Sequence, residues 1–285
     1  MILVIAAPAS AADVVTLRPA TPWNIDYSDD SCALRRSFAY REDIVAFELR
    51  QFAPGDTFSV VIATRDKGFR KRTPEVRFTP GGAKRKIERP LYVTYANGLK
   101  GVQWKDSFYP EDLVEDVPGK EIYIPPFRSE AQEQKTEIAV TGLEVTGTFP
   151  QNILLSTGEM HKPMQAMRKC LDELLTHWGI DAAAHRTLTR RALPADQGEW
   201  AQRIQANYPS AMLEKSKSGI VHVRLMLDAA GKPTACKIQA KSQDMAFEQT
   251  ACSGLMKYGR FEPALDAAGK PIASYIATTV IYLVN

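Results

Sequence analysis

The chain has 285 residues, of which 45% are hydrophobic and 24% are charged, and its formal net charge is +3. This composition excludes an intrinsically disordered chain, and the small net charge gives no electrostatic reason to expect nucleic acid as a partner. The length is sufficient for two hydrophobic cores. We therefore expect an α+β protein with two globular domains, preceded by a short leader.

Residues 1–11, MILVIAAPASA, resemble an export signal, because an apolar run ends at Ala9 and Ala11 with one residue between them. No basic residue precedes the run, and a first β-strand is the alternative interpretation. The run is too short for a membrane span, which needs about 20 apolar residues. We therefore expect an exported, periplasmic chain without an evident transmembrane anchor.

Residues 12–181 are predicted to form a β-rich, sandwich-like domain that ends in a helix. Short alternating or apolar runs are separated by Pro-Gly, Gly-Gly and Asn-Gly pairs, which favour turns. Apolar residues at spacings of three or four between Met160 and Trp178 predict the helix, and Gly179 ends it. The predicted strands comprise residues 32–40, 44–52, 57–64, 91–95 and 136–146.

Segment 65–89 holds ten Lys or Arg residues and three Asp or Glu residues, a net charge of +7, and an acidic block at 111–121 follows it. Two interpretations of the basic segment stay open. It could bind an anionic partner, such as lipid headgroups, lipopolysaccharide or an acidic protein, or it could be a solvated hairpin. Nucleic acid is not expected, because only Phe69 and Phe78 interleave with the basic residues.

The predicted helix begins with Met160 and His161 and continues through Met164 and Met167, a set that could suggest a soft-metal site. Methionine on a helical stripe usually fills a hydrophobic core, and we prefer that interpretation. The four histidines of the chain show no H-x-x-x-H or H-E-x-x-H spacing. We therefore expect no metal and no cofactor.

The sequence contains no G-x-S-x-G elbow, no P-loop and no G-x-G-x-x-G pattern. His177 with Asp172 or Asp181 could form a catalytic dyad. A histidine near a helix end is more often a capping or surface residue. We therefore expect a binding protein rather than an enzyme.

Residues 182–206 have a thin apolar pattern, with Pro194 and Gly198 as helix breakers, and are predicted to connect the two domains. Beyond this connector, residues 207–285 are predicted to form a small second domain. Its local signals agree on a β-β-α-β module.

Two alternating runs at 220–227 and 236–241 indicate the strands of a hairpin. Asp244 offers an N-cap or a first-turn carboxylate to a helix that ends near Gly259. A long strand at 272–284 closes the chain. These three signals give the module one sheet with a helix packed on it.

The heptapeptide LDAAGKP occurs at residues 227–233 and again at 265–271. Gly231 in the first copy supplies the positive φ that such a turn usually requires. The flanks of the two copies differ. We therefore interpret the repeat as reuse of one turn and not as a duplicated domain.

The four cysteines are predicted to form two disulfides, which fits export. Cys236 lies on the strand face that the helix must cover, and Cys252 lies on that helix, so the two can meet. Cys32 and Cys170 would then form the second bridge, within the N-terminal domain. Free thiols or a zinc site are the alternatives, although no Cys-x-x-Cys occurs and no histidine lies within five residues of a cysteine.

Spaced motifs of residues 208–285 occur in an order known from one protein family. They are Tyr208-Pro209, Gly219, the Asp228-x-x-Gly231 turn, the Arg260-Phe261-x-Pro263-Ala264 segment, the second glycine turn and the terminal strand. On these motifs the segment resembles the C-terminal domain of TonB energy-transducing proteins. The resemblance implies a periplasmic domain that captures an extended peptide, the TonB box of an outer-membrane transporter, by adding it to a sheet edge.

The chain departs from that family, whose members have an inner-membrane helix and a proline-rich spacer, neither of which is evident here. Two hypotheses follow. In the first, the module binds a protein partner, such as an outer-membrane TonB-dependent receptor, by strand addition. The expected edge is the last strand, lined by Tyr275, Ile276, Thr278, Val280 and Tyr282.

In the second hypothesis, the module is a structural or dimerising appendage. The N-terminal β-domain would then carry the function, either as an envelope-binding domain or as an enzyme without a recognisable motif. A homodimer is compatible with this alternative.

Overall fold

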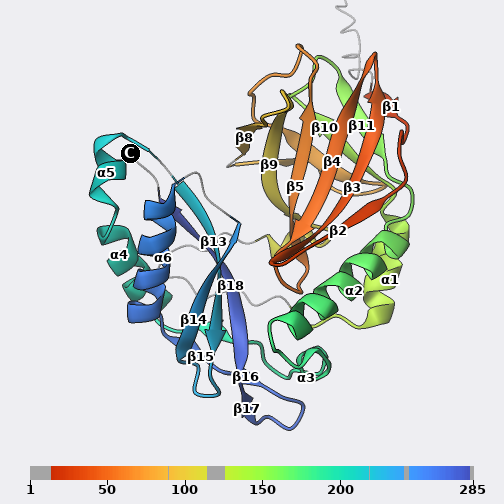
Figure 1. The fold of residues 1–285 in the computed structure, drawn as a ribbon. Helices are drawn as coiled ribbons and strands as arrows, with labels where there is room; N and C mark the ends of the chain where they lie inside the picture. Colours follow the sequence, from red (N-terminus) through yellow and green to blue (C-terminus); the bar gives the residue numbers. More distant parts are fainter. Residues whose placement is uncertain (1–13, 89, 114–125, 218, 241–243, 283–285) are drawn as a thin grey trace, which may run out of the picture.

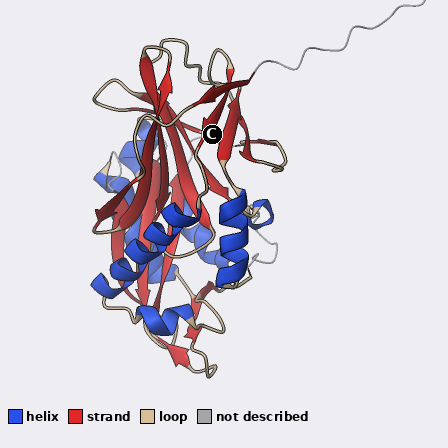
Figure 2. Ribbon diagram, turned by 90° about the vertical axis from the view of Figure 1, so that its right-hand side faces the viewer, coloured by secondary structure: helices blue, strands red, loops and turns tan. Residues whose placement is uncertain are grey.

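The computed structural model divides into two units that lie side by side (Figure 1). An N-terminal unit contains two β-sheets and two long helices, and a C-terminal unit contains a three-stranded sheet with helices on one face. The strands of both units run roughly along one long axis of the molecule (Figure 2). The mixed, β-rich fold class is confirmed. The described residues are 14–88, 90–113, 126–217, 219–240 and 244–282, so the leader at 1–11 lies outside them.

The larger N-terminal sheet is antiparallel throughout its six strands. Its central strands pair with the strands that precede and follow them in the sequence. The predicted strands at 32–40, 44–52, 57–64 and 91–95 are confirmed to within about one residue at each end. The strand at 100–107 was not predicted. In spatial order the sheet consists of β2 (Asn24–Ser28), β3 (Ser31–Tyr40), β4 (Asp43–Gln51), β5 (Thr57–Thr64), β9 (Lys100–Ser107) and β8 (Leu91–Thr94).

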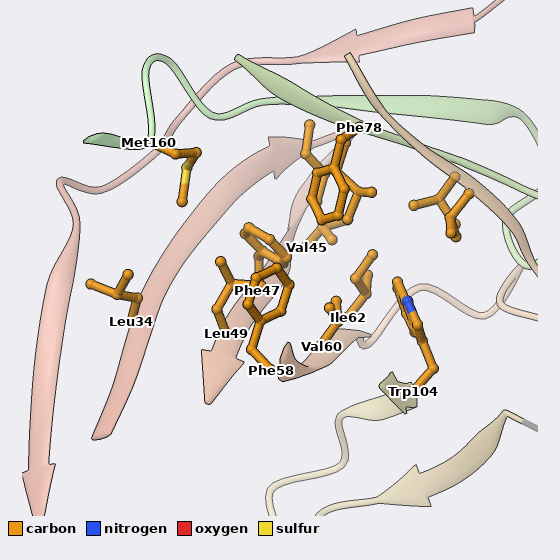
Figure 3. Close-up of a cluster of buried hydrophobic side chains, with 14 of the residues drawn as sticks. Leu34, Val45, Phe47, Leu49, Phe58, Val60, Ile62, Phe78, Trp104 and Met160 are labelled. Atoms are coloured by element: carbon orange, nitrogen blue, oxygen red, sulfur yellow. The ribbon is translucent and has the colours of Figure 1, made fainter. Parts of the chain in front are cut away.

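A second, five-stranded sheet packs face to face with the first and completes the sandwich. Alternate residues of β4, namely Val45, Phe47 and Leu49, are at most 2% exposed and point toward Phe78 of the second sheet (Figure 3). This alternation is what the period-2 pattern predicts for a half-buried strand. The second sheet has the order β1 (Val14–Leu17), β11 (Asn152–Ser156), β10 (Gly142–Thr146), β6 (Glu75–Thr79) and β7 (Arg85–Lys86).

The prediction of one strand over residues 136–146 is wrong in its first part. Residues up to Ala139 belong to helix α1 (Glu130–Ala139), and β10 begins at Gly142. The helix forms because Ser129 and Gln132 make a reciprocal capping box at its start. Glu137 then extends from this helix to His161 at 2.9 Å and to Arg168 at 2.5 Å, so its carboxylate is buried with partners.

Helix α2 (His161–His177) follows the prediction and closes one side of the sandwich. Met164 and Met167 are 7% and 0% exposed and lie in the hydrophobic core, as does Met160. The thioethers therefore fill the core. A short 3-10 helix, η1 (Pro110–Asp112), follows β9.

The C-terminal unit has the predicted β-β-α-β order. Its sheet has the strand order β14 (Pro233–Ala240), β13 (Gly219–Leu227) and β18 (Ser274–Tyr282), and helix α6 (Met245–Tyr258) packs on one face. The carboxylate of Asp244 accepts the N–H of Ala246, and Gly259 follows the last helical residue, as predicted. The predicted final strand divides into β17 (Pro271–Ile272) and β18, and residues beyond Tyr282 lie outside the described ones.

The predicted connector at 182–206 is not a simple linker. It contains α3 (Ala182–Arg186), β12 (Leu193–Pro194) and α4 (Gln197–Ala206), and α4 packs on α6. Trp200 and Ile204 are 7% and 2% exposed and belong to the second core. The folded C-terminal unit therefore begins before residue 207, because these two residues, four apart, form one apolar helix face. The remaining short elements are α5 (Ser210–Glu214), β15 (Phe261–Glu262) and β16 (Ala264–Leu265).

Both predicted disulfides are present, and no cysteine is free. Cys32 and Cys170 join β3 to α2 in the N-terminal unit. Cys236 and Cys252 join β14 to α6 in the C-terminal unit. Each bridge therefore fastens a helix to the sheet that it covers.

The repeated heptapeptide allows a matched test of tertiary packing. Gly231 and Gly269 have nearly equal φ values of +77° and +75°. A Cβ at Gly231 would collide with the carbonyl group of Phe261, whereas one at Gly269 would meet nothing within 4 Å. We expect Gly269→Ala to cost about 1 kcal/mol of the free energy of unfolding, the usual cost of the left-handed conformation. We expect Gly231→Ala to cost about 3 kcal/mol or more, because the backbone must also shift.

Denaturant unfolding of the two variants checks this expectation. Equal losses would show that the Phe261 backbone yields freely, which would contradict the tight packing of β15 against the first turn.

Candidate peptide-binding edge

Strand β18 forms one edge of the C-terminal sheet, since it pairs with β13 and the sheet order ends with it. The pairing is antiparallel and regular from Gly219↔Tyr282 to Leu227↔Ser274. One face of β18 lies against the second core and the opposite face is directed toward the N-terminal unit. The edge between these two faces is the candidate site.

The predicted site residues fall on different faces of the strand. Ile276, Val280 and Tyr282 are 9%, 8% and 0% exposed and pack in the second core, and Thr278 shares their side of the strand. Tyr275 points the other way. This division follows from the alternation of side chains along a strand. Only the backbone of these residues can meet a peptide at the edge, whereas the exposed side chains of β18 are those of Ala277, Thr279 and Ile281.

The first end of β18 is held by Trp178, which directly follows α2, and by His185 of α3. The Nε2 atom of His185 lies 2.9 Å from the hydroxyl of Ser274, and its ring stacks on Tyr275 at 5.9 Å. Trp178 contacts the same tyrosine ring edge-on at 5.7 Å. Burial raises the pKa of Tyr275, and Arg191 opposes that effect. This end of the strand is thereby anchored to the rest of the chain.

The other end of β18 is held by α4 and by the segment before β13. Gln205 donates its Nε2 hydrogen to the carbonyl of Ile281 at 2.7 Å. The ring of Tyr282 stacks on Phe247 at 5.1 Å and meets Tyr208 edge-on at 5.4 Å. Burial raises the pKa of Tyr282 to about 12. The Tyr208-Pro209 motif thus acts in packing the end of the edge strand.

Between these two ends, residues 276–280 form the accessible length of the edge. In an antiparallel pair, successive residues direct their backbone groups alternately toward the partner strand and away from it. The carbonyl of Ile281 is engaged by Gln205 and so is directed away from β13. The same alternation directs the N–H and C=O groups of Ala277 and Thr279 outward. An added strand of about five residues would fit this length.

The N-terminal unit covers the outer face of the sheet at β13 and β14. Arg224 on β13 is 6% exposed, binds Asp30 at 2.8 Å and lies over the ring of Trp178 at 3.7 Å. Gln239 on β14 donates to the carbonyls of Asp30 and Phe52. The outer face is therefore occupied at β13 and β14, whereas on β18 the side chains of Ala277, Thr279 and Ile281 stay exposed beside the edge.

The ring of His222 on β13 stacks on Phe52 at 4.5 Å, and its Nδ1 atom lies 3.1 Å from the hydroxyl of Thr279. Burial lowers the pKa of His222 below its usual 6.5, and Arg50 lowers it further. The unfolded chain therefore takes up this proton at a higher pH than the folded chain. The corresponding stability is fully present above about pH 6.5 and decreases as the pH falls below it.

We expect the free energy of unfolding to decrease when the pH is lowered from about 7.5 to about 5.5. The variant His222→Gln should lack the share of this decrease that protonation of His222 causes. Chemical denaturation at the two pH values measures the change in the free energy of unfolding. His177→Gln is the control, since His177 is exposed. Equal pH dependence in the parent protein and the His222 variant would contradict the assignment.

The catalytic dyad that His177 could form with Asp172 or Asp181 is not assembled. Asp172 binds Arg186 at 2.6 Å, and Asp181 accepts the N–H of Ala184 as an N-cap, so both carboxylates are engaged away from His177. Across the described residues, no cluster of His, Cys, Asp and Glu has metal-site geometry. No described helix combines the length and apolar character that a membrane span requires.

A three-stranded antiparallel sheet, covered by one helix and ending in an open strand, defines a small domain suited to strand addition. Residues 204–283 match the family model of the Gram-negative bacterial TonB protein C-terminal region. This match confirms the resemblance found at residues 208–285 and begins within α4. Neither a curated protein nor a solved structure matched the chain.

Proposed function

We propose that the protein captures an extended segment of a protein partner in the Gram-negative cell envelope by adding it as a strand to β18. The observation that carries this proposal is an open edge strand in a domain that matches the TonB C-terminal family. The partner's backbone would pair with the outward groups of Ala277 and Thr279, which gives affinity. The exposed side chains of Thr279 and Ile281 would give selectivity.

The partner that this family match favours is a segment of an outer-membrane TonB-dependent receptor. A periplasmic location is supported by the two disulfides, because such bonds persist in oxidising compartments. The sandwich unit would hold the sheet in a fixed orientation through Arg224 and Gln239. The protein would thus serve as a binding protein, with no catalytic role assigned.

The variant Ala277→Pro tests the proposal, because proline removes an outward N–H at an edge while leaving the β13 ladder intact. We expect peptides taken from receptor TonB-box segments to shift the amide resonances of residues 275–281 in the parent protein. The proline variant should bind roughly tenfold more weakly, since one or two backbone hydrogen bonds are lost. Ala277→Val keeps the amide and is the matched control.

Absence of amide shifts in the parent protein would refute peptide capture. The same edge could instead pair with β18 of a second copy. In that case sedimentation would show a concentration-dependent dimer that Ala277→Pro abolishes, and the module would be a dimerisation element.

A further inference from the structure

The loop between β5 and β6 carries a concentrated positive charge that strand addition does not use. Residues 65–72, which we name the basic loop, contain five cations and one carboxylate, a net charge of +4. We propose that the basic loop binds the surface of a membrane that contains anionic phospholipid. The proposal is independent of the function proposed for β18.

The structure separates the basic loop from the rest of the basic segment 65–89. Arg77 and Lys84 bind the buried carboxylate of Glu144 at 2.6 and 2.9 Å. Arg85 binds the buried Asp106 at 2.5 Å. These three cations have structural partners. Lys86 is exposed as well, but the concentrated positive charge is in residues 65–72. Arg89 lies outside the described residues.

The single carboxylate of the basic loop is already engaged. Asp66 accepts the N–H of Gly68 at 2.6 Å with one oxygen and binds Arg41 at 3.2 Å with the other. The neighbouring β3–β4 turn adds Glu42 and Asp43, which reduce the local charge but leave it positive. The cations of the loop therefore retain charge for an external anion.

The basic loop is held in place by the sandwich. Phe69 is 8% exposed and meets Phe149 edge-on at 5.8 Å, and the N–H of Arg70 donates to the carbonyl of Thr148 at 2.8 Å. The guanidinium of Arg70 donates back to the carbonyl of Lys67 at 2.9 Å. Because the loop backbone is already ordered, binding costs little conformational entropy. Lys67, Lys71 and Arg72 stay exposed.

The loop lies at the end of the molecule away from the C-terminal sheet (Figure 1). Phe52, in the connection between β4 and β5, contacts His222 of the C-terminal unit. The eight residues of β5 then carry the chain about 25 Å away from this contact before the basic loop begins. A membrane bound at the loop would leave β18 free for its partner.

The chemistry favours a diffuse anionic surface over a nucleic acid or an apolar partner. Phe69, the aromatic residue of the loop, is buried, so it is not available for stacking or insertion. Attraction to anionic headgroups needs only exposed cations and contributes roughly a fivefold gain in affinity for each one near the surface. An acidic protein is the alternative partner, and the experiment below distinguishes it from a membrane.

The test is co-sedimentation of the full chain with vesicles of phosphatidylcholine alone or with about one-third phosphatidylglycerol. We expect binding to the anionic vesicles alone, with loss at high salt. Replacing Lys67, Lys71 and Arg72 by glutamine should weaken binding about 100-fold, since three cations are removed. The matched control replaces the exposed Lys232, Lys237 and Lys270 of the C-terminal unit by glutamine and should keep binding within a few-fold.

Equal losses in the two triple variants would overturn the proposal, because binding would then depend on total charge. Failure of the parent protein to bind anionic vesicles would also overturn it. Binding to soluble polyglutamate without vesicle binding would assign the loop to an acidic protein instead. Thermal melting confirms that the variants fold, since the three substituted side chains are exposed.

Discussion

Replacing Cys32 and Cys170 together by alanine is expected to lower the free energy of unfolding of the N-terminal unit by about 4 to 5 kcal/mol. The bridge closes a loop with a sequence separation of 138, and the entropy removed from the unfolded chain grows with loop length. Chemical denaturation under oxidising conditions measures the change.

The matched comparison is the double replacement of Cys236 and Cys252, whose separation is 16. The same relation gives a loss of about 3 kcal/mol, confined to the C-terminal unit. Hydrogen exchange followed residue by residue assigns each loss to its unit, because two domains need not unfold as one. A larger loss from the shorter loop would contradict the loop-length argument.

Asp30→Ala is expected to cost about 2 to 3 kcal/mol and to loosen the contact between the two units. The substitution leaves Arg224 buried at 6% exposure without its carboxylate, and an uncompensated buried charge is costly. Burial lowers the pKa of Arg224, and Asp30 opposes that effect. The loss stays below that of a fully buried pair, because the Asp30 side chain is 30% exposed.

Asp26→Ala is the control, since its pair with Arg35 is 46% and 35% exposed and should contribute less than about 1 kcal/mol. Denaturation and hydrogen exchange at β13 provide the measurements. Arg224→Met should cost less than Asp30→Ala, because it removes the buried charge itself. The reverse order would show that the arginine side chain contributes mainly by packing on Trp178.

Local chemistry determined most of the longer elements. Period-2 alternation gave β3, β4, β5 and β13, and Asp244 and Gly259 gave both ends of α6. The disulfide of the C-terminal unit followed from a strand face and a helix face that had to meet. These features depend on residues close in sequence, so one chain suffices to predict them.

The two wrong predictions, at residues 136–139 and at the connector, have a common cause, which is that tertiary contacts outweigh the local pattern. Residues 136–139 have a β-like composition but join α1, because the capping box at Ser129 and the burial of Glu137 against Arg168 outweigh propensity. Trp200 and Ile204 looked like parts of a linker, because their apolar face is only two residues wide. The surface of α6 on which they pack is remote in sequence and meets them only in the folded chain.

The sequence by itself determined that residues 208–285 form a β-β-α-β module, because alternation, caps and turns are local. The expectation that the last strand is an edge rested on its length and on the resemblance to the TonB family. The tertiary structure alone decided which part of that strand is accessible. His222 and Arg224 alternate with apolar residues and so resemble a solvent face, yet their partners lie in the N-terminal unit, and Asp30 is 194 residues distant from Arg224. Burial of a polar face depends on such remote partners, which no local pattern encodes.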